Sequence, residues 1–568
     1  MTIELLSPVG SMANLKAAIQ KGADAVYLGM QKFSARSYST NFNENYLKQA
    51  VQICKSNNVK IYLAMNTLIK NKEIKDFFNQ LSFAYQAGID AVIIQEISLI
   101  SLIKESFPQL KIHISTQAGV MNSTHANILK VDRINLAREL SKEEILTIRK
   151  NFKKELEIFC HGALCVCFSG SCLFSSFLGG RSGNRGKCAQ PCRKKYNDRY
   201  LLSTKELCLI NKLPEIIKSG INSIKIEGRM RTPYYVATVT EAYKEAIQSY
   251  YKNNFHVSKK TEKKLHQAFS REFTEGAYSS NNIFNPIKAS AKTISNKEHY
   301  NVNIKKVNTF RKKPLVKVPN IQHQNSSGKL LIVCAHNQAD AQIALDNGAD
   351  IICYDVMNDD FDSISKIVHN KGKKIYAKTP RLMFDKDISN IKSNINSTCP
   401  DGIFAGNLAI TALNLNLPII LDNNINSFND IDVEFYNKNL KSSTLISPEL
   451  SIKELSKFKN KNFVVFVHGK IRLMTLRHQL KGPLINEMNC RFNTEKIFNG
   501  TQILNNKEFA LLSRAQELVK NGINQFYIDT EKDVHIVGLY RDILDGKPIN
   551  DSQLKRNYVL GWSLKGIL

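Results

Sequence analysis

The sequence predicts an α/β protein with an N-terminal (β/α)8 TIM-like barrel, a small middle segment, and a second, degenerate barrel-like α/β domain made by internal duplication. Three observations predict this fold: apolar runs alternate with helical stretches, the chain is 568 residues long, and motifs of the first half return in the second. At roughly 100–200 residues per domain, two large barrels are compatible with this length. We expect domains at 1–253, 254–328 and 329–568.

Short β-type runs alternate with helical spacing through the first domain, which is typical of parallel βα units. The expected strands are Ile3–Leu6, Ala25–Leu28, Val59–Met65, Ala91–Gln95, Lys111–Ser115, Arg133–Ala137, Leu156–Cys160 and Ser223–Ile226. The expected helices include Ala13–Gln20, Glu44–Ser56, Lys72–Gln86, Glu143–Phe152 and Pro233–Ser249. Eight such strands predict a closed barrel. A doubly wound sheet is the alternative, but the chain has no dinucleotide-binding glycine pattern.

Four motifs of the first half recur in the same order in the second half, and this order indicates a duplication. The pairs are Gly22–Gly29 with Gly348–Asp355, Val59–Ala64 with Lys373–Lys378, Phe159–Gly162 with Phe466–Gly469, and Gly220–Glu227 with Gly522–Asp529. Arg472 stands where the second copy would place Cys165, so we expect the second copy to lack the cysteine cluster described below.

The chain is strongly basic, with 79 Lys and Arg against 50 Asp and Glu and a net charge of +29. Residues 286–320 of the middle segment concentrate nine Lys or Arg and one acid, Glu298. Such a run is either a solvated face or a surface that binds nucleic acid, and a Lys-rich genome would also raise the net charge.

The composition excludes a disordered tail protein, because 43% of the residues are hydrophobic. No apolar run approaches the ~18–20 residues of a membrane span, and the opening residues lack the layout of a signal peptide. We therefore expect a cytoplasmic protein with no membrane partner. Twelve cysteines in such a chain indicate metal or redox chemistry rather than a disulfide framework.

Six of the twelve cysteines lie between residues 160 and 192. Cys165, Cys172, Cys188 and Cys192 have the spacing C-x6-C-x15-C-x3-C, which provides four thiolates from one loop. Four cysteines can hold a tetrahedral zinc ion or a cubane iron–sulfur cluster, and the spacing does not choose between them. The loop follows the carboxyl end of a barrel strand, where barrel enzymes place their chemistry, and this position favours iron–sulfur.

Polar residues directly follow several expected strands, so we expect them to converge on one barrel mouth as a substrate pocket. Strand alternation predicts that Lys225, Glu227 and Arg229 share one side, either as a site or as a structural ion pair. His161 is a candidate acid/base, or only a polar group at a strand end. The candidate mouth residues also include Asn66, Gln117, Arg138 and Glu139.

Several of these motifs together resemble peptidase family U32. They are ELLSPVGS at 4–11, GADAVYLG at 22–29, the HGALC…SGSC…GRSGNRGKCAQPCR stretch at 161–193, and KIEGR at 225–229. The resemblance covers the first barrel almost end to end, and the second half resembles the extension of the longer members.

The resemblance implies two competing functions. The older label of the family is a collagenase-like peptidase, but the sequence has no recognisable protease motif. Other members are oxygen-independent hydroxylases that hold a [4Fe-4S] cluster on four cysteines and act on tRNA wobble uridine, an rRNA cytidine or a quinone precursor. Prephenate is the oxygen source in the RNA branches.

We therefore expect an RNA hydroxylase that modifies an rRNA cytidine or a tRNA wobble uridine, with a peptidase and an RNA-binding scaffold with a structural metal as the alternatives. Carried over from the family, the cluster ligands are Cys165, Cys172, Cys188 and Cys192, with zinc as the alternative metal. The expected catalytic residues are His161, Lys225, Glu227 and Arg229. The expected substrate-binding residues, some of them for a dicarboxylate such as prephenate, are Arg181, Arg185, Gln117, Asn66, Arg138 and Glu139.

Overall fold

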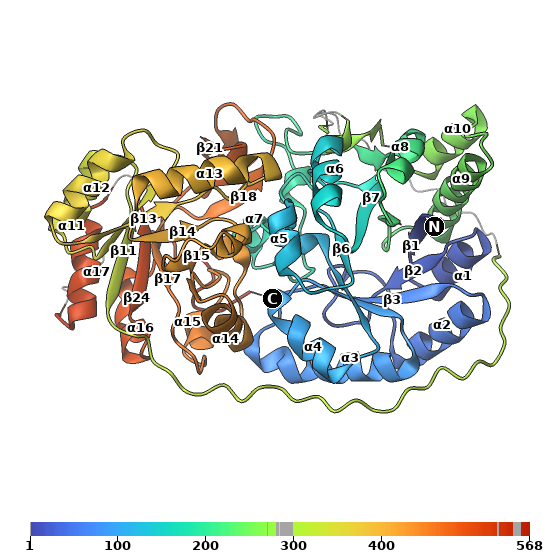
Figure 1. Ribbon diagram of the computed structural model, residues 1–568, viewed down its shortest axis with the longest axis horizontal. Helices are drawn as coiled ribbons and strands as arrows, with labels where there is room; N and C mark the ends of the chain where they lie inside the picture. The colour runs from blue at the N-terminus through green and yellow to red at the C-terminus, as the bar shows by residue number, and fades with distance from the viewer. Residues whose placement is uncertain are drawn as a thin grey trace. The chain divides into compact units, whose positions relative to one another are not determined.

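The computed structural model describes residues 2–269, 271–279, 283–284, 299–530, 533–548 and 558–567. It divides into two compact units (Figure 1). Unit 1 comprises Met1–Gly170 and Gly183–Val318, and unit 2 comprises Ser171–Ser182 and Pro319–Leu568. In this division residues 254–318 of the expected middle segment belong to unit 1. Residues 286–298 of the basic run lie outside the described part of the chain.

Unit 1 is a closed barrel of eight parallel strands, which confirms the predicted fold class. The strands follow one another in chain order from β1 to β7, and β9 closes the barrel by pairing with both β1 and β7. All eight predicted strands are present. The barrel strands are β1 (Glu4–Pro8), β2 (Ala25–Leu28), β3 (Lys60–Met65), β4 (Ala91–Ile94), β5 (Lys111–Ile114), β6 (Arg133–Asn135), β7 (Glu155–Ala163) and β9 (Ser223–Ile226).

The helices of unit 1 cover the barrel with one apolar face each. In α2, the side chain of Asn43 caps the first turn by accepting a hydrogen bond from the backbone of Tyr46, while Leu47 and Val51 are buried. The helices are α1 (Met12–Gln20), α2 (Glu44–Ser56), α3 (Ile74–Ala87), α4 (Ile100–Ser106), α5 (Ser123–Ile128), α6 (Lys142–Asn151), α8 (Leu213–Lys218), α9 (Pro233–Tyr251) and α10 (Lys259–Ala268). Two short strands extend the sheet beyond β7, namely β8 (Glu206–Cys208) and β10 (Phe273–Thr274).

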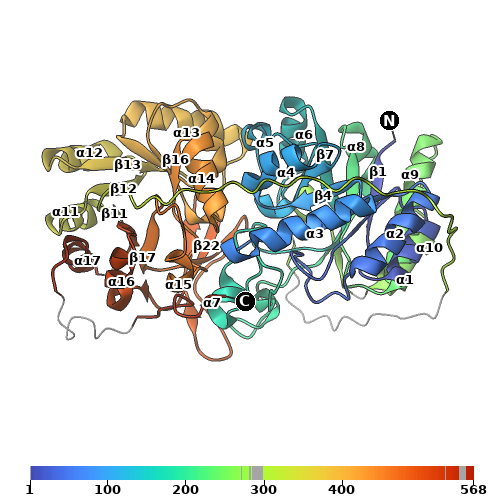
Figure 2. The same ribbon diagram turned by 90° about the horizontal axis from the view of Figure 1, so that it is seen from below.

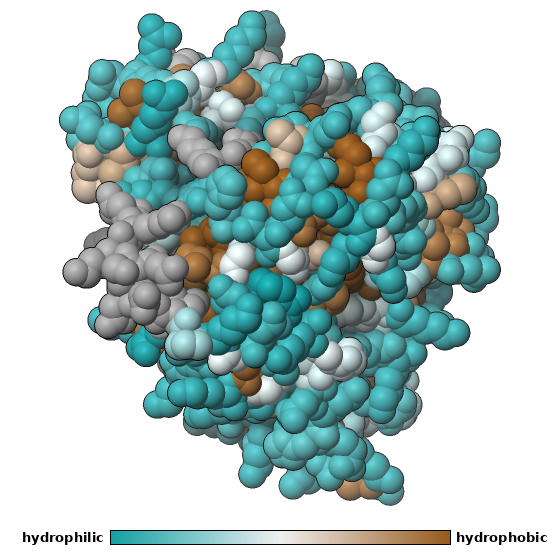
Figure 3. All heavy atoms as spheres, turned by 90° about the vertical axis from the view of Figure 1, so that its left-hand side faces the viewer, coloured by the Kyte–Doolittle hydropathy of each residue, from teal (hydrophilic) through white to brown (hydrophobic). Residues whose placement is uncertain are grey.

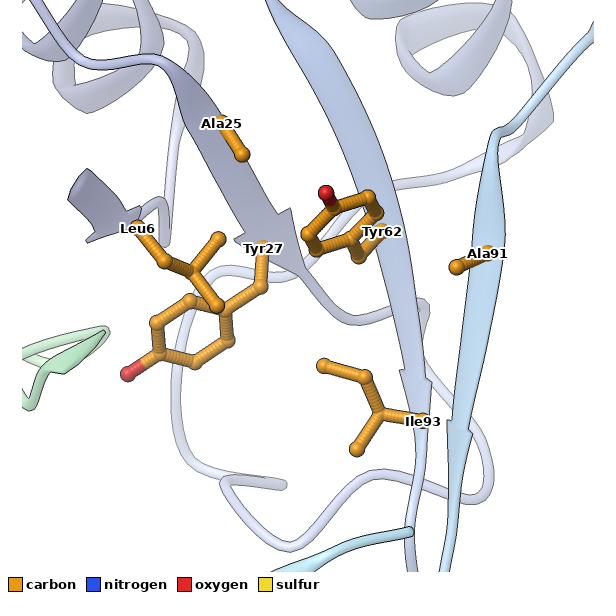
Figure 4. Packing of buried hydrophobic residues seen from close by; sticks show 6 residues of the cluster. All are labelled: Leu6, Ala25, Tyr27, Tyr62, Ala91 and Ile93. Atoms are coloured by element: carbon orange, nitrogen blue, oxygen red, sulfur yellow. The ribbon is translucent and has the colours of Figure 1, made fainter. Parts of the chain in front are cut away.

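The barrel interior is packed by alternate side chains of neighbouring strands. Tyr27 extends across the interior, and its hydroxyl donates to the backbone carbonyl of Ile226 at 2.9 Å, which ties β2 to β9. Figure 4 shows a buried cluster contributed by β1, β2, β3 and β4: Leu6, Ala25, Tyr27, Tyr62, Ala91 and Ile93.

A network of buried charged side chains joins β1, β6, β7 and β9 inside the barrel. The guanidinium of Arg133, with 3% of its side chain exposed, contacts the carboxylates of Glu4 and Glu157. Glu157 also accepts a hydrogen bond from Lys225 at 3.0 Å, and Ser223 donates to both carboxylates. Burial alone would raise the pKa of Glu4, but the charge and hydrogen bonds of Arg133 and Lys60 lower it to about 2. The network therefore links four of the barrel's strands through ionised groups.

Unit 2 repeats this topology in an incompletely closed form. Its β24 lies between β11 and β17, as β9 lies between β1 and β7 in unit 1. Between β16 and β17 the ladder is replaced by an isolated parallel bridge that joins Leu445 to Val464. The parallel strands are β11 (Leu330–Cys334), β12 (Ile351–Asp355), β13 (Lys374–Lys378), β14 (Gly402–Ala405), β15 (Ile419–Leu421), β16 (Ser442–Thr444), β17 (Val465–Gly469) and β24 (Gln525–Asp529).

The four repeated motifs end on corresponding strands of the two units, in the pairs β2 and β12, β3 and β13, β7 and β17, and β9 and β24. The helices of unit 2 are α7 (Phe174–Gly179), α11 (Gln338–Asp346), α12 (Phe361–Asn370), α13 (Asp385–Thr398), α14 (Asp430–Asn439), α15 (Ile452–Leu455), α16 (Ala515–Lys520) and α17 (Ile536–Asp545). After β17 the chain forms antiparallel strands instead of a cysteine loop: β18 (Arg472–Leu476), β19 (Leu484–Ile485), β20 (Arg491–Phe492), β21 (Thr494–Ile497), β22 (Gly500–Leu504) and β23 (Phe509–Ala510).

No helix in the described part of the chain is both long enough and apolar enough to cross a membrane. Figure 3 looks onto the side of unit 2 that carries α11 and α12. Hydrophilic residues cover most of this side, with hydrophobic residues scattered between them.

Residues 299–318 form an extended strap on the outer helices of unit 1 (Figures 1 and 2). Tyr300 is buried against Ala17 and Ala237, and the backbone of Val307 exchanges two hydrogen bonds with the side-chain amide of Gln52. The carbonyls of Asn303 and Lys305 accept hydrogen bonds from Asn57 and Ser56 at the end of α2, and Arg311 donates to the carbonyl of Ile89 after α3. Helices of a (β/α)8 barrel end on the side where the strands begin, so the strap lies at the closed end of the barrel, opposite the mouth.

The buried network makes a specific prediction about stability. Changing Arg133→Met should lower the free energy of unfolding of unit 1 by about 3–5 kcal/mol, because Glu4 and Glu157 would keep buried charges without their main partner. Chemical denaturation followed by circular dichroism measures this loss. The control is Lys32→Met, which removes a cation from the exposed pair with Asp76 and should leave the transition unchanged. Equal transitions for the two variants would contradict the assigned role.

Candidate active site

The mouth of the unit 1 barrel contains a polar pocket with about 560 Å³ of empty space. The pocket lies at the carboxyl ends of the strands, where this fold places its chemistry. Its lining residues are Tyr27, Ala35, Arg36, Ala64, Asn66, Ile93, Ser115, Thr116, Gln117, Asn135, Arg138, Phe159, Lys225, Glu227 and Arg229.

Glu227 places a buried carboxylate at this pocket, and its main partner is Arg36. The Nε and Nη2 atoms of Arg36 lie 3.2 and 3.0 Å from the same oxygen, Oε1. Burial opposes ionisation, but the charges of Arg36, Arg231 and Arg138 together hold the pKa of Glu227 below its ordinary value. The group is therefore a carboxylate at neutral pH and is suited to orienting a ligand or accepting a hydrogen bond.

Lys225 and Arg229 line the same pocket as Glu227, as strand alternation predicts. Neither makes the direct contact with Glu227 that the sequence suggested. The ammonium of Lys225 bonds to Glu157 and lies 4.4 Å from the ring centre of Tyr27, so it connects the buried network to the pocket. Arg229 donates from Nη2 to the hydroxyl of Ser34, and burial lowers its pKa to about 10.

Four buried polar atoms of this pocket have no hydrogen-bond partner among the described residues. They are Gln117 Oε1, Asn135 Oδ1, Arg138 Nε and Arg229 Nη1. An unsatisfied buried polar group costs about 1–3 kcal/mol, so such groups are rare unless a ligand or water completes them. Their concentration in one pocket indicates a site that is completed by a polar ligand.

His161 lies outside this pocket. The pairing of β7 with β9 shifts register between Phe159 and His161, so this irregularity turns the histidine ring towards α9. The ring packs against Tyr235, Tyr243 and Phe273 with centroid distances of 5.4–6.1 Å, and burial lowers its pKa to about 3. It is therefore neutral at physiological pH.

Unit 2 contains a counterpart of this histidine environment. His468 follows the same register shift in β17 and packs 5.8 Å from Tyr540, whose hydroxyl donates to the carbonyl of Val467. In unit 1, Tyr243 donates in the same way to Cys160. Because this arrangement is also present at β17, which no cysteine loop follows, it is explained by packing and does not require catalysis.

Three other candidate residues are absent from the pocket lining. Arg185 makes a two-pronged ion pair with Glu73 and also donates to the carbonyl of Leu68. Glu139 is buried outside the lining. Arg181 belongs to the segment Ser171–Ser182, which is part of unit 2. Asn66, Gln117 and Arg138 do line the pocket.

The unit 1 part of the cysteine loop is held against the loops that follow β2 and β3. Ser37 donates to the carbonyl of Gly186, and Leu68 donates to the carbonyl of Asn184. Gly186 has φ +80°, and a Cβ there would lie 2.4 Å from the carbonyl oxygen of Ser34. Only glycine fits this close approach without a shift of the backbone. The loop therefore lies at the mouth, next to the segment that carries Arg36.

Side-chain hydrogen bonds also connect the neighbours of Cys165 and Cys192. Thr204 Oγ1 donates to the carbonyl of Leu164 at 3.0 Å, and it accepts from the guanidinium of Arg193 at 2.9 Å. Since Leu164 precedes Cys165 and Arg193 follows Cys192, Thr204 bridges the chain on either side of the loop.

The thiols fit the chemistry of a metal or cluster ligand. The backbone N–H of Gln190 donates to Cys188 Sγ at 3.3 Å, and such N–H groups stabilise ligating thiolates. A charge on Cys165 would also raise the pKa of Arg36, which makes this guanidinium a neighbouring counter-charge. The four expected ligands are exposed or partly exposed, whereas Cys160 and Cys167 of the same stretch are buried. Cys172 lies in the segment that belongs to unit 2, so its place in the ligand set rests on the sequence.

The corresponding position in unit 2 has a different chemistry. Asp529, the counterpart of Glu227, is contacted by Arg472, by His336 at 2.9 Å and by Lys378 at 3.6 Å. Burial opposes its ionisation, but these groups hold the pKa of Asp529 well below its ordinary value. Arg472, which replaces the cysteine, also bonds to Gln502. This carboxylate is therefore neutralised by side chains of unit 2 itself.

Cys334, His336 and Asp529 have ligand atoms within 4.8 Å of one another, a spacing compatible with a metal ion. However, the ammonium of Lys378 lies 2.8 Å from Cys334 Sγ and shares Asp529 with Arg472. A divalent cation would have to displace two partly buried cations, Lys378 and Arg472, from its own ligands. We therefore interpret this group as an ion-pair cluster.

Arg36 and Asn135 line the pocket but are not among the residues expected from the sequence. Asn135 is the last residue of β6, and alternation from Arg133 would have placed it inside the barrel. Arg36 lies in a loop eight residues beyond the predicted end of its strand at Leu28, so no periodic pattern predicts its contact with Glu227.

Comparisons with known proteins identify a family and several relatives of this chain. The model of peptidase family U32 matches residues 10–285 and 353–556. A protein of Methanocaldococcus jannaschii named "Uncharacterized protease MJ0090" is 38% identical over 299 residues, which cover 49% of this chain and 73% of that protein. The "tRNA hydroxylation protein P1" of Bacillus subtilis is 33% identical over 291 residues, which cover 47% of this chain and 69% of that protein. The "23S rRNA 5-hydroxycytidine C2501 synthase" of Escherichia coli is 34% identical over 261 residues, which cover 44% of this chain and 39% of that protein.

The ion-pair interpretation of unit 2 predicts that Arg472→Met destabilises this unit by about 3 kcal/mol, because Asp529 would lose its strongest partner in a buried position. Hydrogen exchange followed by mass spectrometry should show faster exchange in β24, which carries Asp529. The control, Arg514→Met, removes a half-exposed cation near Glu517 and should leave exchange in β24 unchanged. Unchanged exchange in the Arg472 variant would contradict the interpretation.

Proposed function

The chain belongs to peptidase family U32, and we propose that it is an oxygen-independent RNA hydroxylase acting on a tRNA wobble uridine or an rRNA cytidine. The observation that carries this proposal is the mouth pocket of unit 1, which holds buried polar atoms without partners among the described residues and lies next to the segment on which the cysteine-containing loop packs. Relatives from both RNA classes support it, since one is named for tRNA hydroxylation and another for synthesis of 5-hydroxycytidine in 23S rRNA.

We propose that Cys165, Cys172, Cys188 and Cys192 hold a [4Fe-4S] cluster. When bound, such a cluster would exchange electrons with the substrates or polarise an oxygen donor. Thr204 and the Gln190 N–H would hold the loop and support its thiolates, because hydrogen bonds to ligating sulfur tune a cluster. From residue 161 to residue 195 the loop contains no Asp or Glu, so no carboxylate of the loop opposes the negative charge of the cluster.

The charge of the pocket favours a small anionic co-substrate. Arg36, Arg138, Lys225 and Arg229 line it together with one carboxylate, Glu227. Guanidinium groups bind carboxylates through paired hydrogen bonds, so a dicarboxylate such as prephenate matches this lining. Arg138 and Arg229 each retain a buried N–H that no described residue accepts, and these two groups would bind the anion.

The target base must reach the mouth unpaired. A base inside a stacked helix cannot enter a protein pocket, so the RNA site is single-stranded or splayed out of its stack. Gln117 Oε1 and Asn135 Oδ1 are acceptors without a described partner. They would accept hydrogen bonds from the base or from hydroxyl groups of the co-substrate.

A peptidase is the second candidate, because a relative is named as an uncharacterized protease. Its chemistry needs a nucleophile beside a general base or an activated water. Among the described residues, the pocket lining includes Ser115 and Thr116 but no histidine, and His161 is buried elsewhere. The pocket therefore favours hydroxylation over proteolysis.

The cluster proposal predicts the metal content of the protein. Purified without oxygen, the full chain should contain about four iron and four sulfide per molecule, as a cubane cluster requires. Cys165→Ala and Cys188→Ala should each lose most of the iron. The controls are Cys167→Ala, in the same loop but buried, and Cys54→Ala, buried in α2, and both should keep it. A colourless wild-type protein with one zinc would contradict the proposal.

The RNA proposal predicts a missing nucleoside in cells without this protein. Mass spectrometry of digested tRNA and rRNA should show the loss of one hydroxylated pyrimidine, restored by the wild-type gene. Glu227→Gln should restore it poorly, because Arg36 would lose its ionic partner at the pocket. Intact modification in the deletion strain, together with gelatin digestion that persists in Cys165→Ala, would favour the peptidase.

A further inference from the structure

Two basic stretches of unit 1 are candidates for contact with a polyanion, and they lie at opposite ends of the barrel. The strap, residues 299–318, contains five lysines and one arginine and no acid. The second stretch, residues 194–199, contains Lys194, Lys195 and Arg199 with one acid, Asp198. We call residues 194–199 the basic turn.

The strap is at the wrong end of the barrel to serve the pocket. Its hydrogen bonds include those to Ser56 and Asn57 at the end of α2, to Gln86 in the last turn of α3 and to Ile89 just after it. These residues precede β3 and β4, and strands of this barrel begin at the face opposite the active site. The backbone of the strap therefore bonds to the face of the barrel that lies opposite the active site.

The basic turn, in contrast, directly follows Cys192 and Arg193 at the mouth. Tyr196 and Arg199 exchange backbone hydrogen bonds of 2.8 and 3.0 Å, and both residues between them have positive φ, at 49° and 60°. This is the geometry of a tight two-residue hairpin turn. The ring of Tyr196 is buried, and its hydroxyl donates to the carbonyl of Pro191 at 3.0 Å, which anchors the turn to the cysteine loop.

The cations of the basic turn are directed to solvent. Lys194 and Arg199 are exposed and Lys195 is half-buried, and no ion pair or side-chain hydrogen bond is recorded for any of them in the described part of the chain. The neighbouring cations have partners within the protein, since Arg193 bonds to Thr204 and Lys205 pairs with Glu272. Exposed cations without carboxylate partners gain the most from a polyanion, because nothing has to be displaced before they bind.

We propose that the basic turn binds the phosphate backbone of the substrate RNA beside the mouth, and that the strap does not contact this RNA. The inference rests on the proposed RNA hydroxylase function and assigns the surface that receives the RNA. A base that enters the pocket leaves its neighbouring phosphates at the rim, and contacts to those phosphates set the position of the strand. A rigid turn anchored to the cysteine loop fixes these contacts relative to Cys188 and Cys192.

The test compares two triple variants with the same change of charge. The first is Lys194→Ala, Lys195→Ala, Arg199→Ala in the basic turn, and the second is Lys312→Ala, Lys313→Ala, Lys317→Ala in the strap. All six side chains are removed without altering backbone hydrogen bonds. Binding of a single-stranded RNA oligonucleotide and of total tRNA is measured at several salt concentrations on the full-length, anaerobically purified protein.

The turn variant should bind RNA about tenfold more weakly, and the slope of log K against log salt should fall by about 2, since each lost phosphate contact contributes about 0.7. The strap variant should stay within about twofold of the wild type. A third variant, Lys194→Arg, Lys195→Arg, Arg199→Lys, keeps the charge and should bind normally. Iron content and thermal unfolding equal to those of the wild type show that the turn variant is folded.

The outcomes separate this inference from the proposed function. If the wild type does not bind RNA, the RNA hydroxylase proposal itself fails. If the wild type binds RNA and the turn variant binds equally well, only the assignment of the surface fails. Equal losses in the turn and strap variants would also overturn the assignment, because they would show that total charge rather than position governs binding.

Discussion

The buried contact of Arg133 with Glu4 and Glu157 is the constraint on which the rest of unit 1 depends. Arg133 on β6 contacts Glu4 on β1 and Glu157 on β7. Glu157 also pairs with Lys225 on β9, the strand that closes the barrel. A charged interior is costly to desolvate, so each ion must keep its partner. Because Lys225 also forms part of the pocket lining, the interaction that closes the barrel positions the residues of the mouth.

The two units share one topology, but the carboxylate at the end of the closing strand has different partners in each. In unit 1 the carboxylate of Glu227 has Arg36 as its ion-pair partner, and the pocket retains polar atoms that have no partner among the described residues. In unit 2 the carboxylate of Asp529 is surrounded by Arg472, Lys378 and His336. Arg472, which stands where the first half of the sequence has Cys165, therefore supplies a counter-ion to the carboxylate of unit 2.

Much of unit 1 could be predicted from the sequence because period-2 and period-3.6 patterns are local. The eight strands and the pocket positions of Lys225, Glu227 and Arg229 follow from such patterns, and the duplication follows from the order of the repeated motifs. The orientation of His161 could not be predicted, because a register shift between β7 and β9 reverses the alternation just before it. The contact of Arg36 with Glu227 joins residues 191 positions apart and leaves no periodic signal.

The sequence by itself determined the fold class, the family resemblance and the four thiols available to a cluster, since all three depend on residue type and spacing. The tertiary structure decided which charged side chains pair within the protein and which are exposed. It pairs Arg185 with Glu73, it places the strap at the closed end of the barrel, and it leaves the basic turn exposed beside the cysteine loop. The net charge follows from the composition. Whether a charged side chain can bind another molecule depends on whether folding brings an opposite charge within a few ångströms of it.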